Sequence, residues 1–207
     1  YATIFRLLCF VMFPVTVIAI VSSHTFVDFF LTHKWLPAVP YMQLFLIEGF
    51  FFALYMLNQN TFNAIGKSGL SLKVDIIKKL LMFSSLFIAF NFGIKALIIG
   101  QVLSSFIVFI YSLLDIKRKL KIEMKFLFSE LHKLSLITML IILIDFFVLQ
   151  EYILGSGILL LSKVVILSLV YCLAVYIFKV HALYDVVVLF EKYLPIKIKR
   201  LIDKRFI

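Results

Sequence analysis

Residues 155–178 read GSGILLLSKVVILSLVYCLAVYIF, and Lys163 is the only charged side chain among them. A bilayer core about 30 Å thick requires about 20 mainly apolar residues in a helix, so this stretch is long enough to cross a membrane. The same measure, applied outward along the chain, identifies six such stretches, at about 4–23, 39–63, 74–91, 94–113, 134–150 and 155–178. The sequence therefore predicts an all-α integral membrane protein with six transmembrane helices.

The composition excludes a water-soluble fold. Hydrophobic residues make up 64% of the 207 residues and charged residues 15%, whereas a soluble domain has about 25% charged residues. The apolar runs are continuous and lack the alternation of an outer-membrane β-strand, so helices are the expected spanning elements. The net charge of +10 comes from cations placed between apolar spans, which indicates topology and lipid contact, and we expect no nucleic-acid partner.

Basic residues gather on alternate connections between the spans, and this pattern predicts which side they occupy. Because Lys and Arg are retained on the cytoplasmic side, both ends of the chain are predicted to be cytoplasmic. The six spans then form a bundle over 1–179, with a basic cytoplasmic loop at 114–133 and a basic amphipathic tail at 180–207. Within these two basic segments, 115–133 and 180–207 are expected to form helices that lie on the membrane surface. The cytoplasmic set is Arg6; Lys67, Lys73, Lys78 and Lys79; Lys117, Arg118, Lys119, Lys121, Lys125 and Lys133; and Lys179, Lys192, Lys197, Lys199, Arg200, Lys204 and Arg205.

The chain offers little that would support soluble enzyme chemistry. Cys9 and Cys172 each lie inside an apolar run, so we interpret both as small core residues and expect no metal site. A Gly-rich phosphate loop and a nucleophile elbow are also absent from the sequence. We therefore expect no enzyme and no cofactor. Because the chain opens with Tyr1 and lacks the pattern of a signal peptide, it is expected to be a fragment of a longer protein.

Pro14 lies in the middle of the first predicted span. A proline has no N–H and its ring clashes with the preceding turn, so the helix should kink there. The carbonyl four residues earlier then loses its usual donor and should be satisfied by a neighbouring element. We interpret Pro14 as a packing feature, with a functional kink as the alternative.

The second span carries polar residues along one face. Tyr41, Glu48, Tyr55, Gln59 and Asn63 follow one another at spacings of seven or four residues, which at about 100° per residue keeps them on one stripe. One interpretation is a stripe that faces a water-filled cavity, with Glu48 as a titratable or cation-binding group near mid-membrane. The alternative is a buried hydrogen-bonded seam between helices.

Asp145 in the fifth span and Lys163 in the sixth are predicted to lie at similar depths. They could form a structural ion pair, or Lys163 could contact an anionic substrate group such as a phosphate. Asp145 and Glu48 are then the candidates for ion coupling.

Small residues recur every four positions in the fourth span, at Ala96, Gly100 and Ser104. This pattern allows two helix backbones to approach closely in lipid, so we interpret it as a packing face.

One stretch resembles a known family. Thr32 to Pro40, read as THKWLPAVP, enters the polar helix, which ends in Asn58 to Gly66 before a Gly-Lys-Ser turn. This arrangement is similar to that of bacterial lipopolysaccharide and exopolysaccharide flippases of the multidrug/oligosaccharidyl-lipid/polysaccharide exporter superfamily. The likeness continues through 76–79 and 93–105 and covers about residues 5–115. The matching residues are Lys34, Trp35, Ala38, Pro40, Asn58, Asn63, Gly66, Lys67 and Ser68.

The resemblance implies a transporter in the bacterial cytoplasmic (inner) membrane that moves a lipid-linked oligosaccharide from the inner to the outer leaflet. Such transporters have two pseudo-symmetric bundles around a central cavity and work by alternating access. The six spans would be one bundle, the C-terminal portion, with the N-terminal bundle of the same protein as partner. Glu48, Tyr55, Gln59 and Asn63 would then line the substrate cavity, with Lys163 as a phosphate contact.

Three alternatives remain open at this point. One is a drug or metabolite exporter of the same superfamily, and another is a non-catalytic membrane scaffold, in which the polar stripe would be a partner seam. The third is a membrane enzyme of polysaccharide assembly, which would require a large polar outer loop; the connection around His24 to Pro37 is short and apolar.

Overall fold

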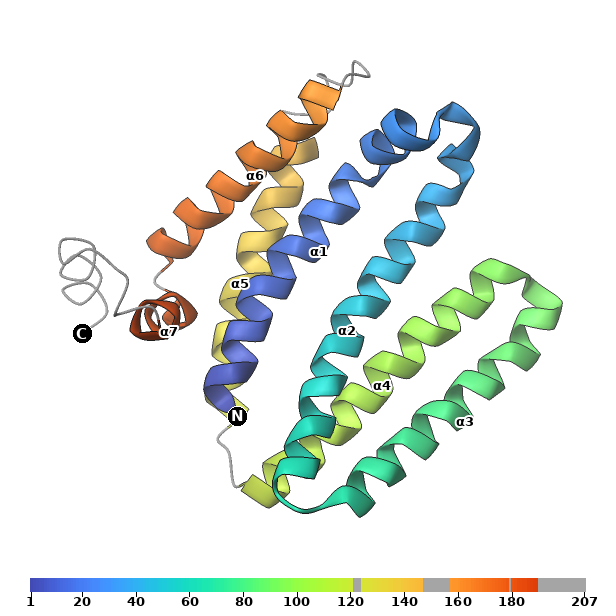
Figure 1. The fold of residues 1–207 in the computed structure, drawn as a ribbon, viewed down its shortest axis with the longest axis vertical. Helices are drawn as coiled ribbons and strands as arrows, with labels where there is room; N and C mark the ends of the chain where they lie inside the picture. Colours follow the sequence, from blue (N-terminus) through green and yellow to red (C-terminus); the bar gives the residue numbers. More distant parts are fainter. Residues whose placement is uncertain (121–123, 147–156, 179, 190–207) are drawn as a thin grey trace. The chain divides into compact units, whose positions relative to one another are not determined.

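The computed structural model describes residues 1–120, 124–146, 157–178 and 180–189, and the secondary structure in these ranges is helical throughout. Long apolar sequences without interior breakers favour this outcome, because a helix satisfies every backbone group within one segment. Figure 1 shows the helices in chain order. They are α1 (Ala2–Leu31), the 3-10 helix η1 (His33–Ala38), α2 (Val39–Ala64), α3 (Ser68–Phe92), α4 (Ile94–Leu120), α5 (Met124–Ile144), α6 (Gly157–Ile177) and α7 (His181–Leu189).

Four segments of the described chain are long and apolar enough to cross a membrane: Ala2–Leu31, His33–Ala64, Ile94–Leu120 and Leu160–Ile177. The protein is therefore an all-α protein of the multi-pass membrane class, as the sequence predicted. Helices also cover most of the other two predicted spans. α3 carries Asp75, Lys78 and Lys79 in its first half, and the apolar helix described within α5 is the shorter Leu131–Ile144.

The basic segment at 114–133 differs from the expected loop with a separate surface helix. α4 continues as far as Leu120 and α5 begins at Met124, so the described parts of this segment extend the two flanking helices. The segment contains neither Gly nor Pro and is rich in Lys and Leu, residues that favour helix continuation. Of the expected tail helix at 180–207, the structure describes α7; residues 190–207 lie outside the described part.

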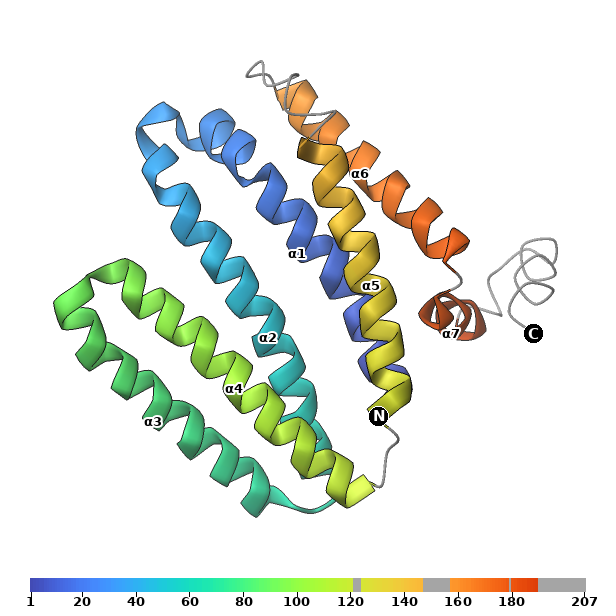
Figure 2. The ribbon, with the colours of Figure 1, turned by 180° about the vertical axis from the view of Figure 1, so that it is seen from behind.

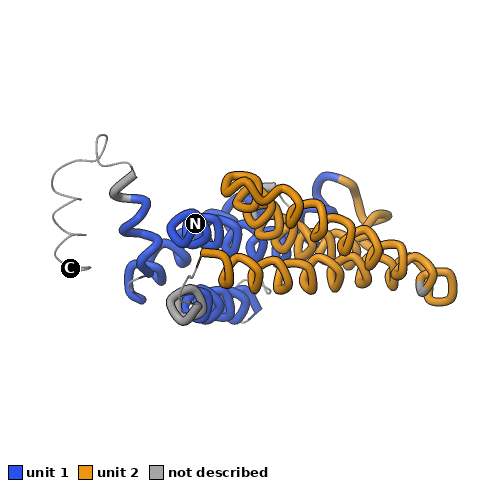
Figure 3. Tube along the Cα trace, turned by 90° about the horizontal axis from the view of Figure 1, so that it is seen from below, with its two compact units in different colours: residues 1–30, 124–207 blue, residues 31–123 orange. Residues whose placement is uncertain are grey.

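The chain divides into two compact units, which Figure 3 colours separately. Unit 1 contains 1–30 and 124–207, so its first helix, α1, is separated in sequence from α5, α6 and α7. Unit 2 is the continuous segment 31–123, which holds α2, α3 and α4. Within unit 2, α4 packs against both α2 and α3, and Figure 2 shows the three helices from behind.

Two glycines set the turns of unit 2. Gly66 ends α2 with a φ of +70°, and its N–H donates to Asn63 O at 3.1 Å while Lys67 N–H donates to Phe62 O at 2.8 Å. This pair of bonds is a Schellman motif, which turns the chain sharply into α3. Gly93 alone separates α3 from α4, with a φ of +79° that side chains other than hydrogen rarely allow. The two turns fold the three helices into consecutive antiparallel hairpins.

The small residues of α4 pack closely against α3. A Cβ placed on Gly100 would fall against the Cβ of Ser85, and Ser85 is buried. The packing interpretation of the Ala96, Gly100 and Ser104 pattern is confirmed at Gly100.

Candidate functional site

The polar face of α2 meets a carboxylate that α3 supplies. The Tyr55 hydroxyl donates to Asp75 Oδ1, and Gln59 Nε2 donates to the same oxygen at 2.8 Å. Gln59 Nε2 also lies 2.7 Å from the Tyr55 hydroxyl oxygen and 3.1 Å from the carbonyl oxygen of Ser71. Tyr55 and Gln59 are only 4% and 5% exposed. We call this set, the buried Tyr55, Gln59 and Ser71 with the half-buried Asp75, the α2–α3 seam.

Local helix geometry explains why these four residues meet. Tyr55 and Gln59 are four residues apart, as are Ser71 and Asp75, so each pair lies on one face of its helix. The turn at Gly66 reverses the chain and brings the two faces together a short distance from the turn. The seam thus follows from two i, i+4 pairs joined by a sharp reversal.

Lys78 extends this polar region by a turn of α3. Its Nζ lies 4.4 Å from the centroid of the Phe52 ring and 4.3 Å from that of the Tyr55 ring. Aromatic faces attract a cation through their negative electrostatic potential, and the attraction grows where water is scarce. Among the ion pairs of the described residues, none involves Lys78. The Lys78 ammonium thus lies over the rings of Phe52 and Tyr55, and the Lys78 side chain is half-buried.

Helix α2 is also hydrogen-bonded to serines of α4. Ser105 Oγ donates to Glu48 Oε1 at 2.9 Å, and Asn58 Nδ2 donates to Ser112 Oγ at 2.8 Å. Ser112 Oγ in turn donates to the carbonyl oxygen of Phe109 at 2.9 Å. Asn58 is fully buried, whereas Glu48 is half-buried. Hydroxyl partners on α4 thus satisfy polar groups of α2 that apolar side chains would leave unpaired.

The residues of the α2 stripe differ in their surroundings. Tyr55 and Gln59 take part in the seam, because α3 covers the face of α2 on which they lie. Asn63, placed on the same stripe by its spacing, is exposed at the end of the helix. Tyr41 and Glu48 are half-buried. The residues of the stripe therefore have three different environments. Tyr55 and Gln59 are buried in the seam, Asn63 is exposed, and Tyr41 and Glu48 are half-buried.

In unit 1 the structure brings Lys163 and Asp145 together. Lys163 Nζ lies 2.7 Å from Asp145 Oδ1 and donates to the carbonyl oxygen of Val21 at 3.1 Å. The two side chains are 12% and 15% exposed. A buried pair of this kind stabilises two charges that would each be costly alone. The Lys163 ammonium, for which the sequence also allowed a phosphate contact, is thus bound by a carboxylate and a backbone carbonyl.

Sequence reasoning missed Ser71 and Asp75 as site residues and assigned Lys78 to the membrane interface. A signal was present, because residues 71, 75 and 78 recur at helical spacing on one face of α3, although Ser71 precedes the predicted span at 74–91. Among the described residues, no group of three or more His, Cys, Asp or Glu lies close enough to hold a metal ion.

The helices and the seam define the class: a multi-pass, all-α membrane protein with charged and polar groups fixed between its helices. No protein-family model, curated protein or solved structure matches the chain.

Proposed function

We propose that the chain is the C-terminal portion of a flippase that moves a lipid-linked oligosaccharide from the inner to the outer leaflet of the bacterial cytoplasmic membrane. The proposal includes six spans with both ends cytoplasmic. The observation that carries it is the placement of Glu48, Asp75 and Lys78 on packed helices of unit 2, where hydroxyls, an amide and aromatic rings surround them.

Energetics supports a functional interpretation of these charges. An ionised side chain at the centre of a span costs roughly 3 kcal/mol or more, and such groups commonly mark substrate or ion pathways. A sugar head group joined to a phosphate requires polar and cationic contacts at membrane depth while its lipid tail stays in the bilayer. Unit 2 offers both kinds of contact within one three-helix segment.

The roles that we assign to the charged side chains depend on which of them already have partners within the chain. Asp75 accepts two hydrogen bonds from the seam, and Asp145 is paired with Lys163. Glu48 is half-buried and accepts a hydrogen bond from Ser105, and it interacts electrostatically with Lys78; its carboxylate can still accept further bonds from a cation or a sugar hydroxyl. We therefore assign Glu48 as the ion-coupling or substrate carboxylate and Lys78 as the cation of the substrate pathway, in place of Lys163.

Alternating access would move this bundle against the N-terminal bundle of the same protein. In that cycle Glu48 would be exposed to each side in turn, because a carboxylate must gain and release its ion to couple transport. The α2–α3 seam would keep α2 and α3 together as one rigid piece during the motion, since its side chains are mutually bonded and Tyr55 and Gln59 are buried.

The test is the leaflet distribution of lipid-linked oligosaccharide, read by impermeant labelling of the sugar in cells that carry variants of the intact protein. Glu48→Leu and Lys78→Met should leave the substrate on the cytoplasmic side, while the protein remains in the membrane. Asn60→Ala is the matched control, because Asn60 lies on the same helix and is exposed. Normal sidedness in both charge variants would contradict the proposal.

A membrane scaffold is the second candidate, and the seam itself favours it. Tyr55 and Gln59 are buried and bonded as they would be in a purely structural helix contact. A scaffold predicts that Glu48→Leu changes assembly of a partner complex and leaves lipid sidedness unchanged. A drug exporter of the same superfamily predicts instead a change in drug susceptibility with intact surface polysaccharide.

A further inference from the structure

The face of α3 opposite its buried side carries a row of large apolar side chains. Each of them is between 49% and 82% exposed. Their spacings of four, four, three, four and three residues keep them on one stripe of the helix. This α3 stripe consists of Leu72, Ile76, Leu80, Phe83, Phe87 and Phe90.

The length of the α3 stripe matches the thickness of a hydrocarbon layer. From Leu72 to Phe90 the helix rises by about 27 Å at 1.5 Å per residue, close to the 30 Å of a bilayer core. An acyl chain laid along the helix would therefore meet apolar side chains over its whole length.

Two exposed cations of α3 flank the first half of the stripe. Lys73 and Lys79, at about 100° per residue, lie on opposite edges of the stripe, and the Lys73 Nζ lies 5.7 Å from the centroid of the Tyr111 ring of α4. Side chains on a helix lean toward its N-terminus, so Lys79 extends toward the end of α3 where Lys67 is also exposed. In the described part of unit 2, Glu48, Asp75 and Asp115 are half-buried, whereas Lys73, Lys79 and Lys67 are exposed. Cations therefore predominate among the exposed charges at this end of the stripe.

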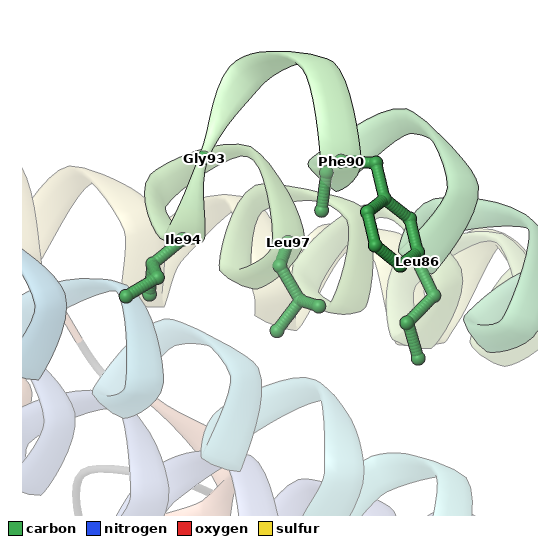
Figure 4. Close-up of a pocket in the computed structure, with 6 residues that line it drawn as sticks. Leu86, Phe90, Gly93, Ile94 and Leu97 are labelled. Carbon is green, nitrogen blue, oxygen red and sulfur yellow. The ribbon is translucent and has the colours of Figure 1, made fainter.

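At the other end of the stripe the α3–α4 turn is hollowed. A hollow of about 330 Å³ is lined by Leu86, Ala89, Phe90, Gly93, Ile94 and Leu97. Figure 4 shows Leu86, Phe90, Ile94 and Leu97 around it, with the backbone of Gly93 at the turn. All six are apolar, and Phe90 belongs to both the hollow and the α3 stripe.

We propose that the outward face of α3 binds one anionic glycerophospholipid, with its phosphate between Lys73 and Lys79 and an acyl chain along the α3 stripe toward the hollow at Gly93. Two cations at one end match the phosphate of that lipid. The apolar stripe is longer than the one leaflet, about half of the bilayer core, that a single acyl chain spans, so the chain would lie on apolar side chains over its whole length and extend toward the hollow. A second copy of the chain fits less well, because pairing two such faces would bring like charges together. The proposal stands independently of the proposed transport activity.

Native mass spectrometry of the full-length protein in detergent, with phosphatidylglycerol or phosphatidylcholine of equal chain length, tests the site. We expect phosphatidylglycerol to bind more tightly, and K73Q/K79Q to weaken it about tenfold, since each lysine near an anionic lipid contributes a few-fold in affinity. K34Q is the control, because Lys34 is exposed in the same unit and lies in η1, outside α3 and α4. Equal binding of the two lipids, or an equal loss in K34Q and K73Q/K79Q, would overturn the proposal.

A second measurement locates the acyl chain. Phosphatidylglycerol with a photoreactive group near the end of one chain should label the peptide that contains residues 86–97. Labelling spread over the other spans would overturn the proposal, as would loss of bound lipid on addition of inorganic phosphate, which would identify a site for the free anion. A lipid-free dimer formed through α3, detected by cross-linking, would assign the face to a second copy instead.

Discussion

The hydroxyl of Tyr171 donates a hydrogen bond of 2.6 Å to the carbonyl oxygen of Phe10. This is the carbonyl that loses its helical donor to Pro14, four residues further along α1. The two rings also lie 5.7 Å apart between their centroids. A side chain of α6 thus completes a backbone hydrogen bond that the sequence of α1 leaves open, as predicted from Pro14 alone.

Removing this hydroxyl should destabilise unit 1 only while Pro14 is present. Tyr171→Phe leaves the Phe10 carbonyl buried without a donor, and we expect a loss of about 1–2 kcal/mol. In a Pro14→Ala background the helix supplies its own N–H, so the same change should cost a few tenths of a kcal/mol. Unfolding of the four proteins in detergent gives the coupling free energy as a double-mutant cycle. Equal costs in the two backgrounds would show that the contribution of the hydroxyl does not depend on the N–H that Pro14 lacks.

The ion pair of Lys163 and Asp145 should depend on both partners. Lys163→Met or Asp145→Leu alone leaves one buried charge unpaired, and we expect each to cost about 3–5 kcal/mol of stability. The double variant should recover most of that loss, because neither charge remains. Thermal unfolding of the purified protein measures this.

The same double variant separates structure from transport. If Lys163 serves only the ion pair, export of the lipid-linked sugar should return with stability in the double variant. Export that stays absent in a stable double variant would instead assign Lys163 a contact with substrate.

Asp75 should stabilise the α2–α3 seam chiefly as an acceptor. Asp75→Leu deprives the Tyr55 hydroxyl and Gln59 Nε2 of their shared oxygen, and we expect a loss of about 2–3 kcal/mol. Asp75→Asn keeps an acceptor oxygen and should cost about half as much. Asn63→Ala is the control, since Asn63 is exposed and should change stability by less than about 0.5 kcal/mol. Equal losses in both Asp75 variants would show that charge, and not hydrogen bonding, dominates.

Gly100 should tolerate no side chain while Ser85 is opposite. A methyl group at Gly100 would collide with the Cβ of Ser85, so Gly100→Ala should force α3 and α4 apart and cost about 1–3 kcal/mol. Ser85→Gly in the same protein opens the required space and should restore much of the stability. The unfolding transition in detergent reports both effects, and an unaffected Gly100→Ala variant would refute the close contact.

Hydropathy predicted the helical elements, because a membrane-spanning helix is recognisable from the apolar residues of its own segment. It was less informative for α3, where Asp75 and Lys78 interrupt the apolar run. Their role depends on α2, which lies across a turn, and a single-helix pattern contains no information on the partner face. The polar region was therefore identified on α2 and missed on α3.

Helical periodicity alone also does not determine the surroundings of Asn63, at the end of the α2 stripe. Residues four apart advance by 400°, so the direction drifts by about 40° at each step. Two steps carry Asn63 about 80° away from Tyr55, and at the last turn of α2 the chain already reverses through Gly66. Asn63 is consequently exposed. Spacing places residues on a helix, but the neighbouring helices determine which part of its circumference is covered.

The division of unit 1 into 1–30 and 124–207 determines the order in which a ribosome delivers its parts. Phe10 and Tyr171 are 161 positions apart, so at about 5–20 residues per second α1 waits on the order of ten to thirty seconds for the hydroxyl that completes it. During that interval unit 2 is synthesised in full, with every partner of its own seam already present. The nascent chain can thus form its central three helices first, and α1 must be held by the insertion machinery or by lipid until α6 arrives.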